Sequence, residues 1–336
     1  MSNTRREFLQ SSAALAVGLM GGASTALAAE PAAGSQAQNV PTGTQGTQSA
    51  APSAQIQIPK IKFGNVEISR MVLGHNQFCG FSHFSTNLSK DMTTWYTQDE
   101  VCAVMHRANS FGINAYNYSQ NGSEPDSAQR AAEDWARFVA EGGKMYVIAG
   151  DANLDAAGTL SLVNTIKPLA LQRHGMLVDK AFHEGKMDSV VREWCKRARD
   201  LGVMVGVGTH NPKVIEFVEE KGWDVDFYSG CVYQITRTEA EWRQVLNGEL
   251  MEMSGETYVQ SDPARMYKAI RQTAKPCFAF KILAAGRVAD DAIEQAFRTA
   301  FSSIKPIDSI YVGMYPRHKD EMKENVEIVH RILTGA

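Results

Sequence analysis

The chain has 336 residues, of which 44% are hydrophobic and 21% are charged, and its formal net charge is −3. A chain of this length can bury a large core, and the weak acidic charge argues against binding to nucleic acid or to an anionic membrane. The five cysteines are scattered without a C-x-x-C pair, so neither a disulfide framework nor a structural zinc motif is expected. Past the first 29 residues there is no apolar run of about 18 residues, and no stable membrane span is predicted.

The first 29 residues have the features of an export signal. Arg5 and Arg6 form a twin-arginine pattern, an Ala/Gly-rich apolar segment follows, and Ala26-Leu27-Ala28 is an A-x-A cleavage site. We therefore expect 1–29 to be a twin-arginine signal peptide read by the twin-arginine export machinery, with a periplasmic or secreted mature protein. Residues 30–55 are rich in Ala, Gln, Ser, Thr, Gly and Pro, which predicts a disordered linker ahead of one domain over 56–336.

In the domain, short apolar runs alternate with helical segments. A β-hairpin is expected first, with arms at Ile56–Phe63 and Val66–Ser69 joined by Gly64-Asn65. The expected strands are Met71–Gly74, Ile113–Tyr118, Met145–Ala149, Met176–Glu184, Val203–Val207, Val225–Val232, Cys277–Leu283 and Ser309–Gly313. Expected helices include one from Gln98, Ser127–Glu141, Leu160–Arg173, Met187–Leu201, one from Pro212 and an extra one at Glu239–Leu246. Later helices are indicated by apolar stripes beginning at Ile293 and at Met322.

This alternation predicts an α/β fold, a (β/α)8 TIM barrel with an N-terminal β-hairpin. An open doubly wound sheet is the main alternative, but the turn after the first strand has no G-x-G-x-x-G. The loops Phe78–Thr97 and Tyr233–Asp262 are long, and the first is rich in aromatic residues. Such loops either contact substrate or pack onto the barrel rim, and the sequence leaves both interpretations open.

Four motifs resemble the aldo/keto reductase superfamily. They are the opening stretch Phe63–Gly74, the segment Gly112–Tyr118, the turn Gly122-Ser123-Glu124, and Val312-Gly313 with Glu324-Asn325 downstream. The resemblance implies an oxidoreductase acting on a small carbonyl or sugar-like substrate with NADP(H). It also implies a cofactor site that includes Gly313, Arg317, Lys319 and Asn325.

The catalytic tetrad of that family matches only in part. Asn117 stands at the Asp position, Ser119-Gln120-Asn121 at the Tyr position, and Gly150-Asp151 at the Lys position. Only His183 fits its family role, which is to orient the carbonyl. A proton donor would then have to come from Lys281 or from a tyrosine such as Tyr233 or Tyr118.

The polar residues near the predicted strand ends suggest other chemistry. They are His75, Asn117, Asp151, Asp179, His183, His210, Asn211, Cys231, Tyr233 and Lys281. If Met176–Glu184 is a strand, Asp179 and His183 share one face. His183, His210 and Cys231 follow three consecutive strands and would suit a divalent metal such as zinc.

Lys281 lies inside an apolar stretch, which suits a base or a Schiff-base nucleophile as well as a lysine paired with a carboxylate such as Asp179. Asp151 is a candidate base or partner for it. The sequence thus leaves three hypotheses: the oxidoreductase, a metal- or lysine-dependent lyase, isomerase or hydrolase on the same barrel, and a non-catalytic sugar-binding protein.

Overall fold

The computed structural model describes residues 56–120, 122, 124–150, 163–247 and 255–335. The predicted signal peptide, the predicted linker and Asp151 lie outside these residues. A small two-stranded sheet pairs β1 (Lys60–Phe63) with β2 (Val66–Ser69). The barrel strands are β3 (Met71–Leu73), β4 (Ala115–Tyr118), β5 (Tyr146–Gly150), β6 (Ala170–Arg173), β7 (Met204–Thr209), β8 (Phe227–Cys231), β9 (Cys277–Phe280) and β10 (Ser309–Val312).

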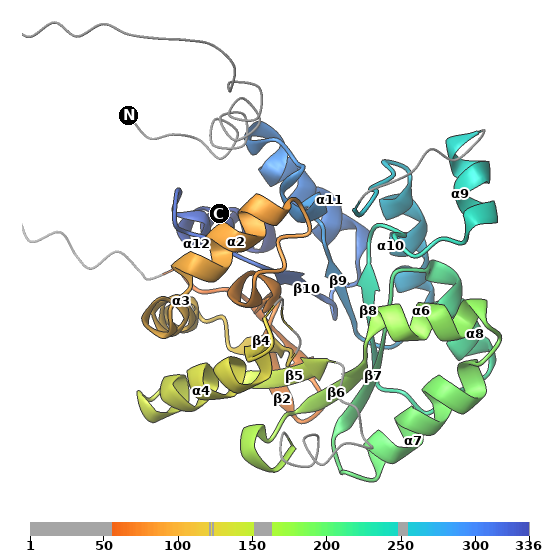
Figure 1. Cartoon of the computed structure of the whole chain (residues 1–336), viewed down its shortest axis with the longest axis horizontal. Coiled ribbons are helices and arrows are strands. Elements are labelled where there is room, and N and C mark those ends of the chain that lie inside the picture. The colour runs from red at the N-terminus through yellow and green to blue at the C-terminus, as the bar shows by residue number, and fades with distance from the viewer. Residues whose placement is uncertain (1–55, 121, 123, 151–162, 248–254, 336) are drawn as a thin grey trace, which may run out of the picture. The chain divides into compact units, whose positions relative to one another are not determined.

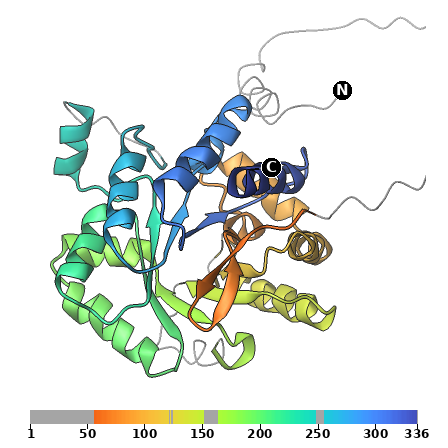
Figure 2. The ribbon, with the colours of Figure 1, turned by 180° about the vertical axis from the view of Figure 1, so that it is seen from behind.

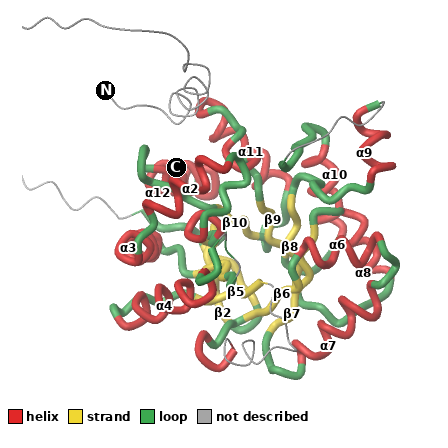
Figure 3. The backbone as a smooth tube through the Cα atoms, viewed as in Figure 1, coloured by secondary structure: helices red, strands yellow, loops and turns green. Residues whose placement is uncertain are grey.

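The barrel strands pair in parallel in the order β10-β3-β4-β5-β6-β7-β8-β9, and the barrel is closed. The helices surround the strands, as Figures 1 and 3 show. They are α2 (Thr86–Trp95), α3 (Gln98–Ser110), α4 (Ser127–Ala140), α6 (Gly175–His183), α7 (Glu193–Arg199), α8 (Pro212–Glu220), α9 (Glu239–Leu246), α10 (Asp262–Gln272), α11 (Ile293–Ser303) and α12 (Glu321–Thr334). The predicted TIM barrel with its N-terminal hairpin is confirmed. Within the described ranges, no helix has the length and apolar character needed to cross a membrane.

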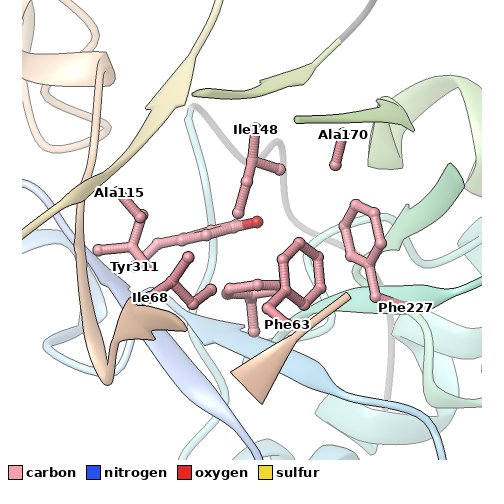
Figure 4. Close-up of a cluster of buried hydrophobic side chains, with 9 residues drawn as sticks. Phe63, Ile68, Ala115, Ile148, Ala170, Phe227 and Tyr311 are labelled. Carbon is pink, nitrogen blue, oxygen red and sulfur yellow. The ribbon is translucent and has the colours of Figure 1, made fainter. Parts of the chain in front are cut away.

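The hairpin closes the amino end of the barrel, where it is seen crossing in front of the strands in Figure 2. Phe63 and Ile68 are fully buried and pack against residues near the starts of the strands, including Ala115 and Ala170 (Figure 4). The Phe63 ring meets the Phe227 ring edge to face at a centroid distance of 5.3 Å. This cluster is an apolar layer that fills the barrel interior at that end.

Side chains alternate along each strand, so the next inward layer lies two residues further on. There Ser229 donates a hydrogen bond to the Gln172 side chain, and its hydroxyl lies 3.1 Å from the Tyr311 hydroxyl. The interior thus changes from apolar to polar on the way to the carboxyl ends of the strands. This gradient places the chemically useful groups at that end of the barrel.

One predicted strand is wrong. Met176–Glu184 was expected to be the fourth barrel strand, but the structure has α6 at Gly175–His183. The fourth strand is β6, Ala170–Arg173, within the stretch expected to be helical. In α6 the buried residues Gly175, Val178, Asp179 and Ala181 recur at helical spacing, whereas the expected strand needed a period of two. Asp179 and His183 therefore do not share a strand face.

The other long segments follow the predictions more closely. The extra helix expected at Glu239–Leu246 is confirmed as α9, which begins with a capping box between Thr238 and Glu241. The first long loop contains a helix that was not predicted, α2, capped by the Ser85 side chain. α2 covers the rim of the barrel beside α12 (Figure 1).

Candidate functional site

The carboxyl ends of the strands bring together an ion-paired cluster around Lys281. Lys281 directly follows β9, and its ammonium group lies 2.6 Å from Oε2 of Glu256. Tyr258 donates a hydrogen bond to the same oxygen at 2.5 Å, and Nδ1 of His83 lies 2.8 Å from the other oxygen, Oε1. Only 9% of the Lys281 side chain is exposed. The carboxylate is therefore the common partner of a lysine, a tyrosine and a histidine from three different loops.

The backbone at this cluster is strained. Lys281 has φ +60°, and Ala284 and Ala285 in the same loop have φ +48° and +51°. His83, on the opposite side of the cluster, has φ +55°. Left-handed conformations cost residues with a Cβ roughly 1–2 kcal/mol each, and they concentrate at functional sites. The left-handed turn thus stands at the residue whose amine pairs with Glu256.

Electrostatics keep the cluster charged. Burial by itself raises the pKa of Glu256, but His83 and Lys281 outweigh burial and hold that pKa well below its usual range. Burial and the adjacent Glu256 carboxylate both raise the pKa of Tyr258. Arg287 stacks on the Tyr258 ring at 4.3 Å and donates to the His83 carbonyl oxygen at 2.9 Å. At neutral pH the cluster holds an ionised carboxylate and a protonated tyrosine beside the lysine.

A second cluster is centred on Asp179, a fully buried residue of α6. Its carboxylate accepts hydrogen bonds from the backbone N–H of His210 at 2.9 Å, from Nδ1 of His210 at 2.8 Å and from the Thr236 hydroxyl at 2.8 Å. The Thr209 hydroxyl also donates to it. Burial alone raises the pKa of Asp179, but the His210 and Thr209 interactions outweigh burial and lower it. Asp179 is thus an ionised carboxylate shared by His210 and two threonines.

Cys231, at the end of β8, connects the two clusters electrostatically. Burial raises the pKa of its thiol to about 12, Lys281 lowers it, and Glu256 and Asp179 raise it. Charges from both clusters therefore act on one buried sulfur. Cys231 is a neutral thiol at physiological pH, and the thiolate is the form that attacks electrophiles or binds metals.

The structure separates the three residues expected to bind a metal. His183 lies at the exposed C-terminal end of α6, and its Nε2 is 2.7 Å from the Thr236 carbonyl oxygen. His210 is committed to Asp179, and Cys231 is enclosed. Across the described ranges, no three or more His, Cys, Asp or Glu residues are grouped so that they could hold a metal ion. The residues present do not fit the expected zinc site.

The other predicted site residues have mixed positions. Asn117 lies inside the barrel, 3.4 Å from the Ile148 carbonyl oxygen, and Tyr233 is half-buried with its ring 5.0 Å from that of Tyr258. Lys281 pairs with a carboxylate, as one interpretation expected, but that carboxylate belongs to Glu256 and not to Asp179. Asp151 lies outside the described residues.

The residues expected to bind a nucleotide are engaged with other groups. Arg317 pairs with Asp91, and Lys319 lies 2.7 Å from Glu324. Asn325 is buried in α12, and a Cβ at Gly313 would lie 2.5 Å from the Gln77 side-chain oxygen. Both cations are neutralised by carboxylates, so this segment does not fit a nucleotide phosphate in this conformation.

The aromatic residues of the first long loop divide between the two expected roles. Phe78 and Tyr96 are buried against each other, with ring centroids 4.9 Å apart, and they pack the loop onto the barrel. Phe84 is half-buried, and the Arg287 guanidinium lies 5.1 Å from its ring beside the Lys281 cluster. Packing explains the first pair, while Phe84 lies beside the Lys281 cluster.

Sequence reasoning missed Glu256, Tyr258, His83 and Thr236. These residues come from loops, and the sequence separation of 25 between Glu256 and Lys281 carries no periodic signal that would join them. The one available signal was Lys281 itself, because a lysine in an apolar strand requires a carboxylate partner.

Comparisons with known proteins find barrels of low sequence identity. No family model and no curated protein matches the chain. A truncated 3-deoxy-D-arabino-heptulosonate 7-phosphate synthase from Thermotoga maritima is 12% identical, with 83% of this chain and 92% of that chain covered and a TM-score of 0.47. Dihydropteroate synthase from Yersinia pestis is 9% identical, with 83% and 100% covered and a TM-score of 0.46. N-acetylneuraminic acid synthetase from Leptospira borgpetersenii is 10% identical, with 84% and 92% covered and a TM-score of 0.42. The likeness is one of fold.

The predicted membership of the aldo/keto reductase superfamily is wrong. The structural neighbours are TIM-barrel enzymes of other families. The physical reason is that the matching motifs lie mostly in the hairpin, β3, β4, β10 and α12, which form the frame of the barrel, and a shared frame does not imply a shared function. The one tetrad residue that matched, His183, is an exposed helical residue instead of a strand-end group.

Proposed function

We propose that this barrel is a lysine-dependent lyase or isomerase that acts on a small carbonyl compound, with Lys281 as the group that receives the carbonyl oxygen. The observation that carries the proposal is the almost completely buried ammonium of Lys281, held 2.6 Å from Glu256 at the carboxyl end of β9. In barrels of this type that end bears the active site. A strained backbone and a buried charge are both costly, which favours a functional role for the lysine.

Lys281 acts electrostatically in this proposal. Its partner Glu256 is ionised and lies 2.6 Å from the amine, so the ion pair holds the lysine in one position. When a base removes the hydrogen next to a carbonyl, the C–H electrons form a carbon–carbon double bond and the carbonyl oxygen becomes negative. A pre-oriented cation in a partly dry site stabilises that oxygen. Return of the proton at another carbon is an isomerisation, and loss of a leaving group from the enolate is a lyase reaction.

The test is hydrogen–deuterium exchange at the carbon beside the carbonyl. The purified protein is incubated in D2O with a panel of small ketones that includes pyruvate and dihydroxyacetone, and exchange is followed by proton NMR. The wild type should catalyse exchange of at least one probe, and Lys281→Met should slow it by about 10²-fold or more. Lys281→Arg, which keeps the charge, should retain part of the activity.

Lys275 gives a matched control. It forms a comparable ion pair, 2.5 Å from Glu219, but it precedes β9 and lies at the amino end of the barrel. Lys275→Met should leave exchange unchanged. No exchange by the wild type with any probe would contradict the proposal. Borohydride trapping of a ketone on Lys281 would contradict the electrostatic role, because it would show a covalent imine.

A further inference from the structure

The second cluster contains a histidine paired with a buried carboxylate, an arrangement suited to a base. His210 immediately follows β7, and its Nδ1 is 2.8 Å from Asp179, so the ring donates its Nδ1 proton to the carboxylate. This hydrogen bond fixes the tautomer and leaves Nε2 with its lone pair free. Asp179 is held by three other donors, so it cannot turn away from the ring without losing them.

The ring lies at the carboxyl end of the barrel, just past the end of β7. Alternation places Gly206 and Gly208 on the inward side of β7, and a Cβ at Gly206 would collide with the ring of Phe227. The His210 ring meets the Phe280 ring at a centroid distance of 5.6 Å, and Phe280 directly precedes Lys281. Among the described residues no hydrogen bond engages Nε2, and 6% of the His210 side chain is exposed.

Gly175 makes room for this arrangement. A Cβ there would lie 2.9 Å from Cε1 and 3.1 Å from Nδ1 of His210. Its φ is not in the left-handed region, so the backbone alone does not require glycine at this position. The close approach of the imidazole does require it. The first residue of α6 and the buried Asp179 one turn later thus position the same ring.

We propose that His210 is the general base of this site and that Asp179 is its positioning residue; this inference rests on the proposed function. Nε2 takes the proton from the carbon beside the carbonyl while Lys281 receives the developing charge on oxygen. The C–H bond breaks, its electrons form the carbon–carbon double bond of the enolate, and the imidazole becomes an imidazolium beside Asp179. The imidazolium then returns the proton to the product, which restores the resting site without any other reactant.

The same exchange assay tests this with different variants. His210→Gln should slow ketone exchange by about 10²-fold or more, the usual contribution of a positioned acid–base group, at an unchanged KM for the probe. Asp179→Asn should also slow exchange, because the amide can donate to Nδ1 and thereby move the ring proton to Nε2. Nitrogen-15 NMR of histidine-labelled protein should show the Nδ1–H tautomer of His210 in the wild type and its loss in Asp179→Asn.

His106→Gln is the matched control, because His106 also pairs with a carboxylate, Glu141, at 2.9 Å but lies on α3 outside the barrel. It should exchange ketone at the wild-type rate. Full exchange by folded His210→Gln, with loss in Lys281→Met, would overturn the role of His210 and leave the proposed function standing. A wild-type His210 protonated at Nε2 would overturn it independently of any substrate. An inactive wild type would overturn both proposals together.

Discussion

Arg237 and Asp262 form an ion pair in which each side chain is 2% exposed. Arg237 lies near the start of the long loop after β8, and Asp262 is the first residue of α10, where that loop ends. Asp262 also accepts the backbone N–H of Gln234 at 3.1 Å. The pair therefore ties together both ends of the loop that carries Glu256 and Tyr258.

Asp262→Ala should be strongly destabilising, because it leaves the Arg237 guanidinium buried without its charge partner. We expect the free energy of unfolding to fall by about 3–5 kcal/mol, measured by urea denaturation followed by circular dichroism. Glu294→Ala removes the carboxylate shared by the exposed Arg298 and Arg331, and it should lower the free energy of unfolding far less. Equal decreases in the free energy of unfolding for the two variants would show that burial of the Arg237–Asp262 pair does not increase its contribution to stability.

His75 should make stability depend on pH. Burial lowers its pKa to about 4, below the ordinary value of 6.5. Between these values the unfolded chain binds the proton and the folded protein does not, so stability is lost as pH falls, by about 1.4 kcal/mol per pH unit. Burial raises the pKa of Asp134 to about 6, which acts in the opposite direction.

Asp134 is present in both the wild type and His75→Gln. The difference between their free energies of unfolding therefore reports the effect of His75 alone. Glutamine can still hydrogen-bond the Tyr116 hydroxyl, the present partner of His75. Urea denaturation from pH 7 to pH 4 should show the wild type losing stability relative to His75→Gln. A constant difference over that range would mean that the buried imidazole protonates as readily as a free one.

The strained loop after β9 should accept glycine. Ala285 has φ +51° and ψ +42°, which glycine adopts without a Cβ penalty. Ala285→Gly should raise the free energy of unfolding by about 0.5–1 kcal/mol after the entropic cost of glycine. The same change at Ala136, an exposed residue within α4, should lower it by about 1 kcal/mol. Loss of stability at both positions would contradict the claim of strain.

Export by the twin-arginine route remains a prediction from the sequence. Replacing Arg5 and Arg6 by lysine should retain the unprocessed chain in the cytoplasm, while the wild type should appear in the periplasm or medium with the signal peptide removed. Cell fractionation with mass spectrometry of the N-terminus measures both. Equal export of the two proteins would contradict the prediction.

The sequence predicted the barrel because most of its strands are short apolar runs between amphipathic helices. It failed at α6, where the run Met176–Phe182 has the composition of a strand and the burial period of a helix. The true strand, β6, has only four residues and ends with Gln172 and Arg173, so its polar composition hides it. Local composition cannot tell which of the two stretches is the strand and which is the helix. The packing of α6 against β7 decides this, because it determines which stretch is buried on both faces.

The site was predictable only for residues directly attached to strands. Lys281, His210 and Cys231 were found because they follow or end apolar runs. Asp179 was found for the wrong reason, since it reaches the site from a helix and not from a strand. Glu256 and Thr236 reach the site through the three-dimensional course of their loop. The spacing of residues along the sequence does not predict these contacts. The family resemblance was wrong because its motifs belong to strands and helices that build the barrel and not to the candidate site.

The apolar layer around Phe63 and Ile68 affects how a small molecule reaches the barrel interior. That apolar layer fills the amino end, so among the described residues the Lys281 cluster is approached from the carboxyl end, beside Phe84 and Tyr258. A lyase with a single opening must release two products along one route, so the product nearer the opening departs first. Product inhibition should therefore be competitive with substrate for the product that leaves last.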